Sequence, residues 1–305
     1  MNTLDIEELC KLIFSGDRKA IATAITLVES TKREDQDSTN HLLTLLESQQ
    51  TQSIRIGISG PPGVGKSTFI EAIGHSVLES DERLAILAID PSSSISGGSI
   101  LGDKTRMESL SRNENTFIRP SPSGGNLGGV HRSTRESVSV LEAAGYSVIL
   151  IETVGVGQAE TEVFEMTDVF LVLLSPGGGD ELQGIKRGII ELADILVVNK
   201  ADGNLEATSR STVLDYKNAL KLLKPRIQGW SVPVFPCSAL EKNGIDQIWD
   251  KVNNLKDHLV KTGQLEKNRL EQRKIWLKNK KKNLILSAIE SDEELLDKLG
   301  EKIKE

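Results

Sequence analysis

The sequence has few cysteines, no long apolar run and no excess of basic residues, and each shortage excludes a class of protein. Its two cysteines, Cys10 and Cys237, are far apart and lack metal-ligand spacing, so we expect reduced thiols in a reducing compartment. The longest apolar runs, such as Val169–Leu174, are about six residues, whereas a membrane-spanning helix needs about 20. The 37 Lys and Arg against 44 Asp and Glu give a net charge of −7, which argues against a nucleic-acid binder.

The N-terminus also lacks the pattern of a targeting sequence. It carries Asp5, Glu7 and Glu8 and has no basic start followed by an apolar stretch, so we expect a cytoplasmic protein. The length of 305 residues, with 38% hydrophobic and 27% charged residues, is that of a folded globular protein of about two domains.

Short apolar runs alternate with helical stretches from residue 53 to about residue 240. The runs cover residues 54–59, 84–89, 148–151, 169–174, 195–198 and 232–235. Most are continuously apolar, as in strands buried on both faces of a parallel sheet. The pattern predicts an α/β fold, a doubly wound and mostly parallel sheet flanked by helices.

Helical periodicity continues on both sides of this segment. We therefore divide the chain into an N-terminal helical extension (residues 1–50), a central α/β domain (51–245) and a C-terminal helical tail (246–305). The basic stretch at residues 267–282 is interpreted as a solvated helix face, with a patch for nucleic acid or an acidic partner as the alternative. The Gly-, Ser- and Pro-rich residues 91–129 are expected to form a long loop, and loops of this length are usually functional or disordered.

The strongest motif directly follows the first predicted strand and satisfies GxxxxGK(S/T). Its glycines let successive backbone amides point at phosphate oxygens, beside the positive end of a helix. Lys66 is expected to reach the β- and γ-phosphates, and the Ser67 hydroxyl to bind Mg²⁺. The motif consists of Gly60, Pro61, Pro62, Gly63, Val64, Gly65, Lys66, Ser67 and Thr68.

Two further motifs predict that the base is guanine. Asn199, Lys200 and Asp202 follow the strand at residues 195–198. The Asp202 carboxylate can accept hydrogen bonds from guanine N1–H and the exocyclic amine, which adenine cannot donate. Ser238, Ala239 and Leu240 follow the next strand, where a backbone amide could meet guanine O6.

Acidic residues at strand ends are candidates for sensing the metal and the γ-phosphate. Glu152 leaves an apolar strand and precedes the glycine of Val154-Gly155, and we expect it to contact Mg²⁺ through a bound water. Asp90 and Asp103 are further candidates for the metal site. Ras-type proteins carry a water-orienting Gln directly after the switch glycine, but this position is Val156 here. Slow intrinsic hydrolysis is therefore expected.

The stretches around these motifs resemble the MeaB/ArgK family. The similar segments are residues 90–93, 97–107, 152–158 and 176–188. The resemblance covers about residues 50–260 and implies a GTPase that assists a cobalamin-dependent acyl-CoA mutase, chiefly methylmalonyl-CoA mutase. It also implies that residues 176–188, with Lys186, form a switch coupled to the mutase, and that the protein is a homodimer with its tail as a candidate dimerisation arm. The expected catalytic set is Lys66, Asp90, Asp103, Glu152 and Lys186, with GTP or GDP and Mg²⁺ as ligands.

Two other functions are open on the sequence. A phosphotransferase would pass the γ-phosphate to an acceptor other than water, but we find no acceptor pocket in the sequence. A nickel-delivery GTPase would usually carry clustered His or Cys, whereas the four His and two Cys are scattered here.

Overall fold

The computed structural model describes residues 3–49, 52–90, 107–122, 129–153, 159–177 and 187–290. The chain divides into two compact units, Met1–Asp257 and His258–Glu305. The strands are β1 (Ile54–Ser59), β2 (Leu84–Asp90), β3 (Thr116–Pro122), β4 (Val148–Thr153), β5 (Val169–Leu174), β6 (Ile195–Val198) and β7 (Val234–Pro236). The α-helices are α1 (Thr3–Phe14), α2 (Arg18–Val28), α3 (Gln36–Leu46), α4 (Lys66–Glu79), α6 (Glu108–Ser111), α7 (Gly129–Ala143), α8 (Ala159–Phe164), α9 (Arg187–Leu192), α10 (Glu206–Leu220), α11 (Ile245–Lys261) and α12 (Gln264–Glu290).

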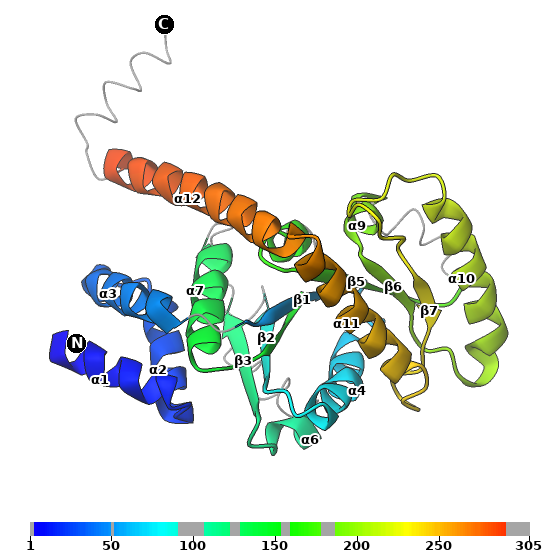
Figure 1. The fold of residues 1–305 in the computed structure, drawn as a ribbon, viewed down its shortest axis with the longest axis horizontal. Helices are drawn as coiled ribbons and strands as arrows, with labels where there is room; N and C mark the ends of the chain where they lie inside the picture. The colour runs from blue at the N-terminus through cyan, green and yellow to red at the C-terminus, as the bar shows by residue number, and fades with distance from the viewer. Residues whose placement is uncertain are drawn as a thin grey trace, which may run out of the picture. The chain divides into compact units, whose positions relative to one another are not determined.

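The first unit is built on a seven-stranded sheet in the order β3-β2-β4-β1-β5-β6-β7 (Figure 1). Every pair of neighbouring strands is parallel. All residues of β4, β5 and β6 are buried, because helices cover a parallel sheet on both faces. The predicted doubly wound α/β fold is confirmed, and the carboxyl ends of the strands share one edge of the sheet.

Strand β3 was not expected, because the sequence predicted one long loop over residues 91–129. The structure places α6 and β3 within that range. Pro120 and Pro122 argued against a strand in the sequence, since proline lacks the backbone N–H that a central strand donates to its neighbour. β3 lies at the edge of the sheet and pairs with β2 alone, which is where a strand tolerates proline.

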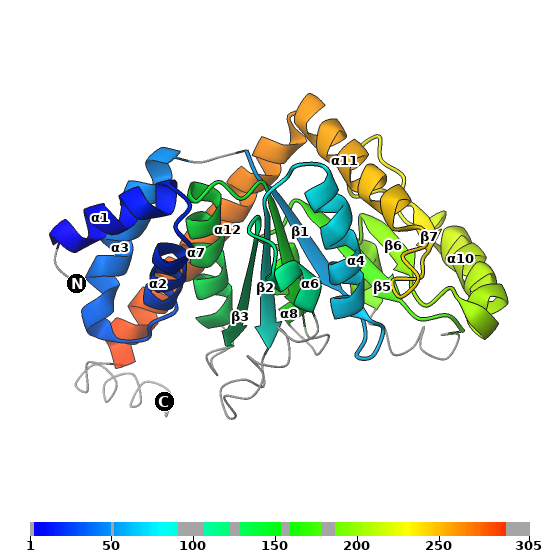
Figure 2. The ribbon, with the colours of Figure 1, turned by 90° about the horizontal axis from the view of Figure 1, so that it is seen from below.

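The N-terminal helices α1, α2 and α3 lie at the β3 end of the sheet and pack against α7 (Figure 2). Their inner faces are fully buried, with Ile13, Ile21 and Leu42 at 0% exposure. The Arg18 guanidinium at the start of α2 donates to the carbonyl oxygens of Glu114 (3.1 Å) and Thr116 (2.7 Å). The expected helical extension is thus attached to the start of β3 by hydrogen bonds, whereas its boundary as a domain stays a prediction.

The last described residues, 245–290, are mostly helical, as the sequence predicts. Asp246 near the start of α11 accepts a hydrogen bond from Ser76 of α4 at 2.8 Å. The second unit contains α12, which carries the basic residues 267–282 and exposes Leu270 and Ile285. Within the described parts of the chain, no helix is both long and apolar enough to cross a membrane.

Candidate nucleotide site

The predicted phosphate-binding loop, residues 60–65, joins the carboxyl end of β1 to the start of α4. Gly60 and Gly65 have positive φ angles of +151° and +91°, which side chains rarely allow. A Cβ on Gly60 would lie 2.5 Å from the carbonyl oxygen of Leu173 in β5, and one on Gly65 would lie 2.8 Å from Nδ2 of Asn199. Both positions therefore require glycine, and the loop is fitted closely between β5 and the chain that follows β6.

The Lys66 amine is held inside this loop. Its Nζ donates to the carbonyl oxygens of Gly60 at 2.8 Å and Pro61 at 3.1 Å. Burial lowers the pKa of Lys66, and the nearby carboxylates of Glu152 and Glu160 oppose that shift. The ammonium group thus lies across the loop, at a point where it can exchange carbonyl oxygens for phosphate oxygens.

Ser67 and Glu152 bring together a hydroxyl and a carboxylate from different parts of the chain. Ser67 Oγ donates to Glu152 Oε1 at 3.3 Å, and Glu152 is only 8% exposed. These are the hard oxygen ligands that Mg²⁺ prefers, and Mg²⁺ usually takes only one or two protein ligands when it also binds phosphates. The described residues hold no cluster of three or more His, Cys, Asp or Glu that could bind a metal alone. The pair therefore fits a Mg²⁺ ion bound together with a phosphate ligand.

Asn199 connects the phosphate-binding loop to the loop after β7. Its Nδ2 donates to the carbonyl oxygen of Val64 at 2.8 Å, and its Oδ1 accepts from the Ala239 amide at 3.0 Å. The side chain is 2% exposed, so both bonds are shielded from water. One amide group thus fixes the distance between the two ends of the candidate site.

Asp202 and Ser238 lie side by side in the two loops that follow β6 and β7. The Ser238 hydroxyl donates to Asp202 Oδ2 and accepts from the Glu241 amide at 3.1 Å. Lys200, between Asn199 and Asp202, has an uncommon φ of +61° and is exposed. The neighbouring Cys237 is buried, and this burial, with the Asp202 carboxylate nearby, raises its pKa to about 12. The thiol is therefore an uncharged core group.

Three of the predicted site residues are only partly covered by the structure or lie outside it. Asp90 ends β2, where Ile89 pairs with Thr153, so its backbone reaches the same edge of the sheet as Glu152. Asp103 and Lys186 lie outside the described residues, as do residues 154–158.

Glu160, which sequence reasoning missed, lies near Lys66. It is 6% exposed in the first turn of α8 and acts electrostatically on the Lys66 amine. Nothing in its sequence context distinguishes it from the other acidic residues of α8, because its closeness to Lys66 depends on how α8 packs on the sheet.

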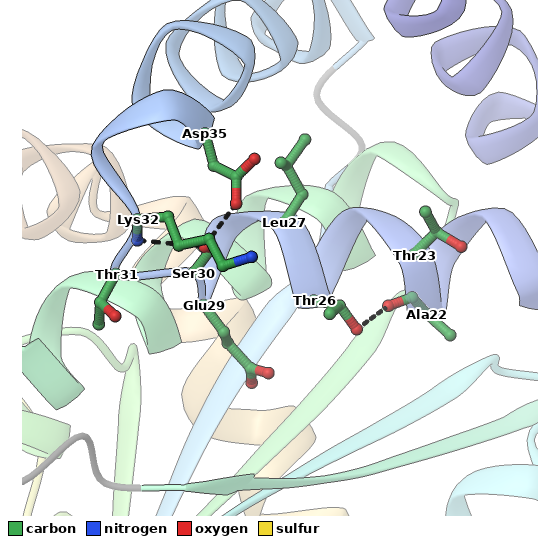
Figure 3. Close-up of a pocket in the computed structure, with 9 residues that line it drawn as sticks. All are labelled: Ala22, Thr23, Thr26, Leu27, Glu29, Ser30, Thr31, Lys32 and Asp35. Atoms are coloured by element: carbon green, nitrogen blue, oxygen red, sulfur yellow. Dashed lines mark hydrogen bonds between the residues drawn. The ribbon is translucent and has the colours of Figure 1, made fainter. Parts of the chain in front are cut away.

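A hollow of about 730 Å³ lies on the N-terminal helices. Figure 3 shows the residues that line it, and none of them belongs to the candidate nucleotide site. The hollow is lined by α2 and the segment up to Asp35, and it contains no predicted site residue. The Ser30 hydroxyl donates to Asp35 there at 2.6 Å. The candidate nucleotide site is thus defined by loop geometry and converging polar groups, and this hollow is separate from it.

Comparison with known proteins gives consistent matches over most of the chain. A family model described as methylmalonyl Co-A mutase-associated GTPase MeaB matches residues 21–294. A Caulobacter vibrioides protein named as a GTPase is 52% identical, with 90% of this chain and 84% of the relative covered. The mouse protein named methylmalonic aciduria type A homolog, mitochondrial, is 47% identical over 90% of this chain and 68% of its own length. A crystal structure titled LAO/AO transport system kinase aligns with a TM-score of 0.81 at 36% identity, covering 96% of this chain and 89% of that one.

Proposed function

The chain belongs to the MeaB family of methylmalonyl Co-A mutase-associated GTPases, and from this we propose that it is a GTP-dependent chaperone for a cobalamin-dependent acyl-CoA mutase. Family membership makes the protein a P-loop GTPase that binds guanine nucleotide. The client mutase is inferred from the family description and from the name of the mouse relative. We take methylmalonyl-CoA mutase as the client.

One observation supports the nucleotide site more than any other: three motifs far apart in sequence meet at one edge of the sheet. The Lys66 amine lies in the phosphate-binding loop, Glu152 in the last two residues of β4 contacts Ser67, and Asn199 holds the loop through Val64. Motifs that matched by chance would have no reason to be hydrogen-bonded to one another. We infer that the triphosphate lies over residues 60–67 and that the base lies beside Asp202.

The chain's own groups have separate tasks in this proposal. The Lys66 ammonium leaves the carbonyl oxygens of Gly60 and Pro61 and binds phosphate oxygens, where charge develops during transfer. Ser67 and Glu152 would hold Mg²⁺, which neutralises charge on the β- and γ-phosphates when bound. Asp202 accepts from guanine, and among residues 238–240 the Leu240 amide is the candidate donor for O6, because the Ser238 and Ala239 amides already donate to Asn243 and Asn199.

We expect Glu152→Gln to slow GTP hydrolysis by about 10- to 100-fold, as loss of a group that supports a metal ion commonly does. GDP affinity should stay nearly unchanged, because the γ-phosphate and its metal contact are absent from GDP. Single-turnover hydrolysis and calorimetry measure the two quantities. The matched control is Glu79→Gln, at the exposed far end of α4. A Glu152→Gln variant that hydrolyses GTP at the normal rate would assign this carboxylate a purely structural role.

We expect the client mutase to accelerate hydrolysis. Val156 cannot orient the attacking water, so the missing contact must come from rearranged loops or from the partner. Such a contact can raise the rate by up to about 10³- to 10⁵-fold. Single-turnover hydrolysis with and without purified methylmalonyl-CoA mutase measures the effect. A fast basal rate that the mutase leaves unchanged contradicts the chaperone proposal, and acceleration only by a small-molecule acceptor would favour a kinase.

The remaining expectations are part of the same proposal. Asp90 and Asp103 are proposed to assist the metal site, and Lys186 to couple residues 176–188 to the mutase. The homodimer, the division into domains at residues 50 and 245, and the cytoplasmic location also stay predictions.

A further inference from the structure

A pair of buried hydroxyl groups joins the ends of β1 and β4 directly beneath the candidate site. The β1–β4 ladder ends with Ile58 paired to Glu152. One residue further on, Thr153 Oγ1 donates to Ser59 Oγ at 3.1 Å and lies 3.5 Å from the Ile58 carbonyl oxygen. Both Thr153 and Ser59 are completely buried. The side chains thus extend the connection between the two strands by one residue, to the point where both leave the sheet.

This hydroxyl bond closes a ring of contacts through the site. Ser59 precedes Gly60, whose carbonyl oxygen accepts from Lys66 at 2.8 Å. Lys66 precedes Ser67, whose hydroxyl donates to Glu152 at 3.3 Å. Glu152 precedes Thr153, which returns to Ser59 at 3.1 Å. Three hydrogen bonds therefore connect β1, the start of α4 and the end of β4.

The three bonds differ in what happens to them when nucleotide binds. In the proposed function, Lys66 exchanges its carbonyl partners for phosphate oxygens, and Ser67 and Glu152 turn to the metal ion. Two bonds of the ring are thus lost to the ligand. The hydroxyls of Thr153 and Ser59 are buried below the loop and have no ligand to bind, so their bond persists.

We propose that Thr153 is a positioning residue that holds the Glu152 carboxylate at the distance from Ser67 that the metal ion requires. The proposal rests on the proposed Mg²⁺·GTP site. Without the hydroxyl bond, the end of β4 loses its side-chain connection to β1 beyond the Ile58–Glu152 pair. The carboxylate and the Ser67 hydroxyl would then be less well placed to bind one ion together.

The test compares Thr153→Val, which keeps the shape but lacks the hydroxyl, with Thr153→Ser, which keeps the hydroxyl. Affinity for a non-hydrolysable GTP analogue is measured by calorimetry at increasing Mg²⁺ concentrations. The quantity compared is the Mg²⁺ concentration at which half of the total increase in affinity is reached. We expect Thr153→Val to raise this concentration about tenfold, as loss of a group that orients a metal ligand does. Metal-free GDP affinity should stay unchanged, and Thr153→Ser should behave as the wild-type protein.

Two further variants keep the test decisive. Thr39→Val removes another buried hydroxyl, which bonds to the Leu27 carbonyl in the N-terminal helices, and it should leave the Mg²⁺ dependence unchanged. Ser59→Ala removes the partner of Thr153. It should reproduce the Thr153→Val shift, and the double variant should shift no further than either single one. If Thr153→Val does not fold, Ser59→Ala serves as the test variant in its place.

The outcomes separate this proposal from the proposed function. A wild-type protein whose GTP affinity is independent of Mg²⁺ would contradict the metal site and the positioning role together. A wild-type protein that depends on Mg²⁺, with Thr153→Val and Ser59→Ala showing the same dependence, would overturn the positioning role alone.

Discussion

Lys66→Ala is expected to abolish tight binding of GTP. The Lys66 ammonium group lies inside the phosphate-binding loop and donates to the carbonyl oxygens of Gly60 and Pro61. In the proposed function, it leaves these oxygens and binds the phosphates. Each hydrogen bond to a charged group contributes about 1.5 to 3 kcal/mol. Loss of two such bonds corresponds to a fall in affinity on the order of 10²- to 10⁴-fold.

The loss should be larger for GTP than for GDP, because Lys66 is proposed to reach both the β- and the γ-phosphate. Calorimetry with both nucleotides gives the ratio. Lys221→Ala is a suitable control, since that amine is exposed just after the end of α10 and donates to Asn218 Oδ1. Thermal unfolding of each variant separates weak binding from loss of fold. GTP affinity that survives Lys66→Ala would place the phosphates elsewhere.

Asp202→Asn is expected to change the preferred base from guanine to xanthine. The Ser238 hydroxyl donates to one carboxylate oxygen of Asp202, which leaves the other oxygen for the base. In the variant, the amide oxygen can keep the Ser238 bond, so that the amide nitrogen faces the base instead. This nitrogen would meet the guanine amine as a second donor, whereas the 2-carbonyl oxygen of xanthine would accept from it.

Polar sites of this kind discriminate between matched and mismatched ligands by up to about 10⁴-fold. The ratio of XTP affinity to GTP affinity should therefore rise in Asp202→Asn. Competition calorimetry with XTP, GTP and ATP measures it. Asp215→Asn, on the exposed side of α10, serves as the charge-matched control. Equal GTP and XTP affinity in both the variant and the wild-type protein would contradict the role of Asp202 in base recognition.

The sequence predicted those parts of the fold in which local pattern and tertiary environment agree. β5 and β6 begin and end where their apolar runs do, because strands buried on both faces need apolar residues throughout. β3 was missed because its edge position tolerates two prolines that a central strand would exclude. Whether a strand lies at the edge depends on the assembled sheet, and the local sequence pattern does not predict it.

The same distinction applies to the candidate site. Lys66, Ser67 and Asn199 belong to motifs in which one short segment fixes the geometry, so they could be named from the sequence. Glu160 lies near Lys66 only because of how α8 packs. Thr153 meets Ser59 only because β4 lies beside β1. These contacts depend on the strand order, which the alternation of strands and helices leaves open.

The Asn199 side chain has a consequence for the energetics of ligand capture. Since its amide already joins Val64 to Ala239, little conformational freedom remains between the phosphate end and the base end to be lost when nucleotide arrives. A pre-organised pocket of this kind retains more of the interaction energy as affinity. Guanosine and triphosphate, presented as separate fragments, would bind at two ends whose separation is already fixed by Asn199. Compared with the two fragments, the intact nucleotide would bind more tightly chiefly because it loses translational and rotational entropy once and not twice.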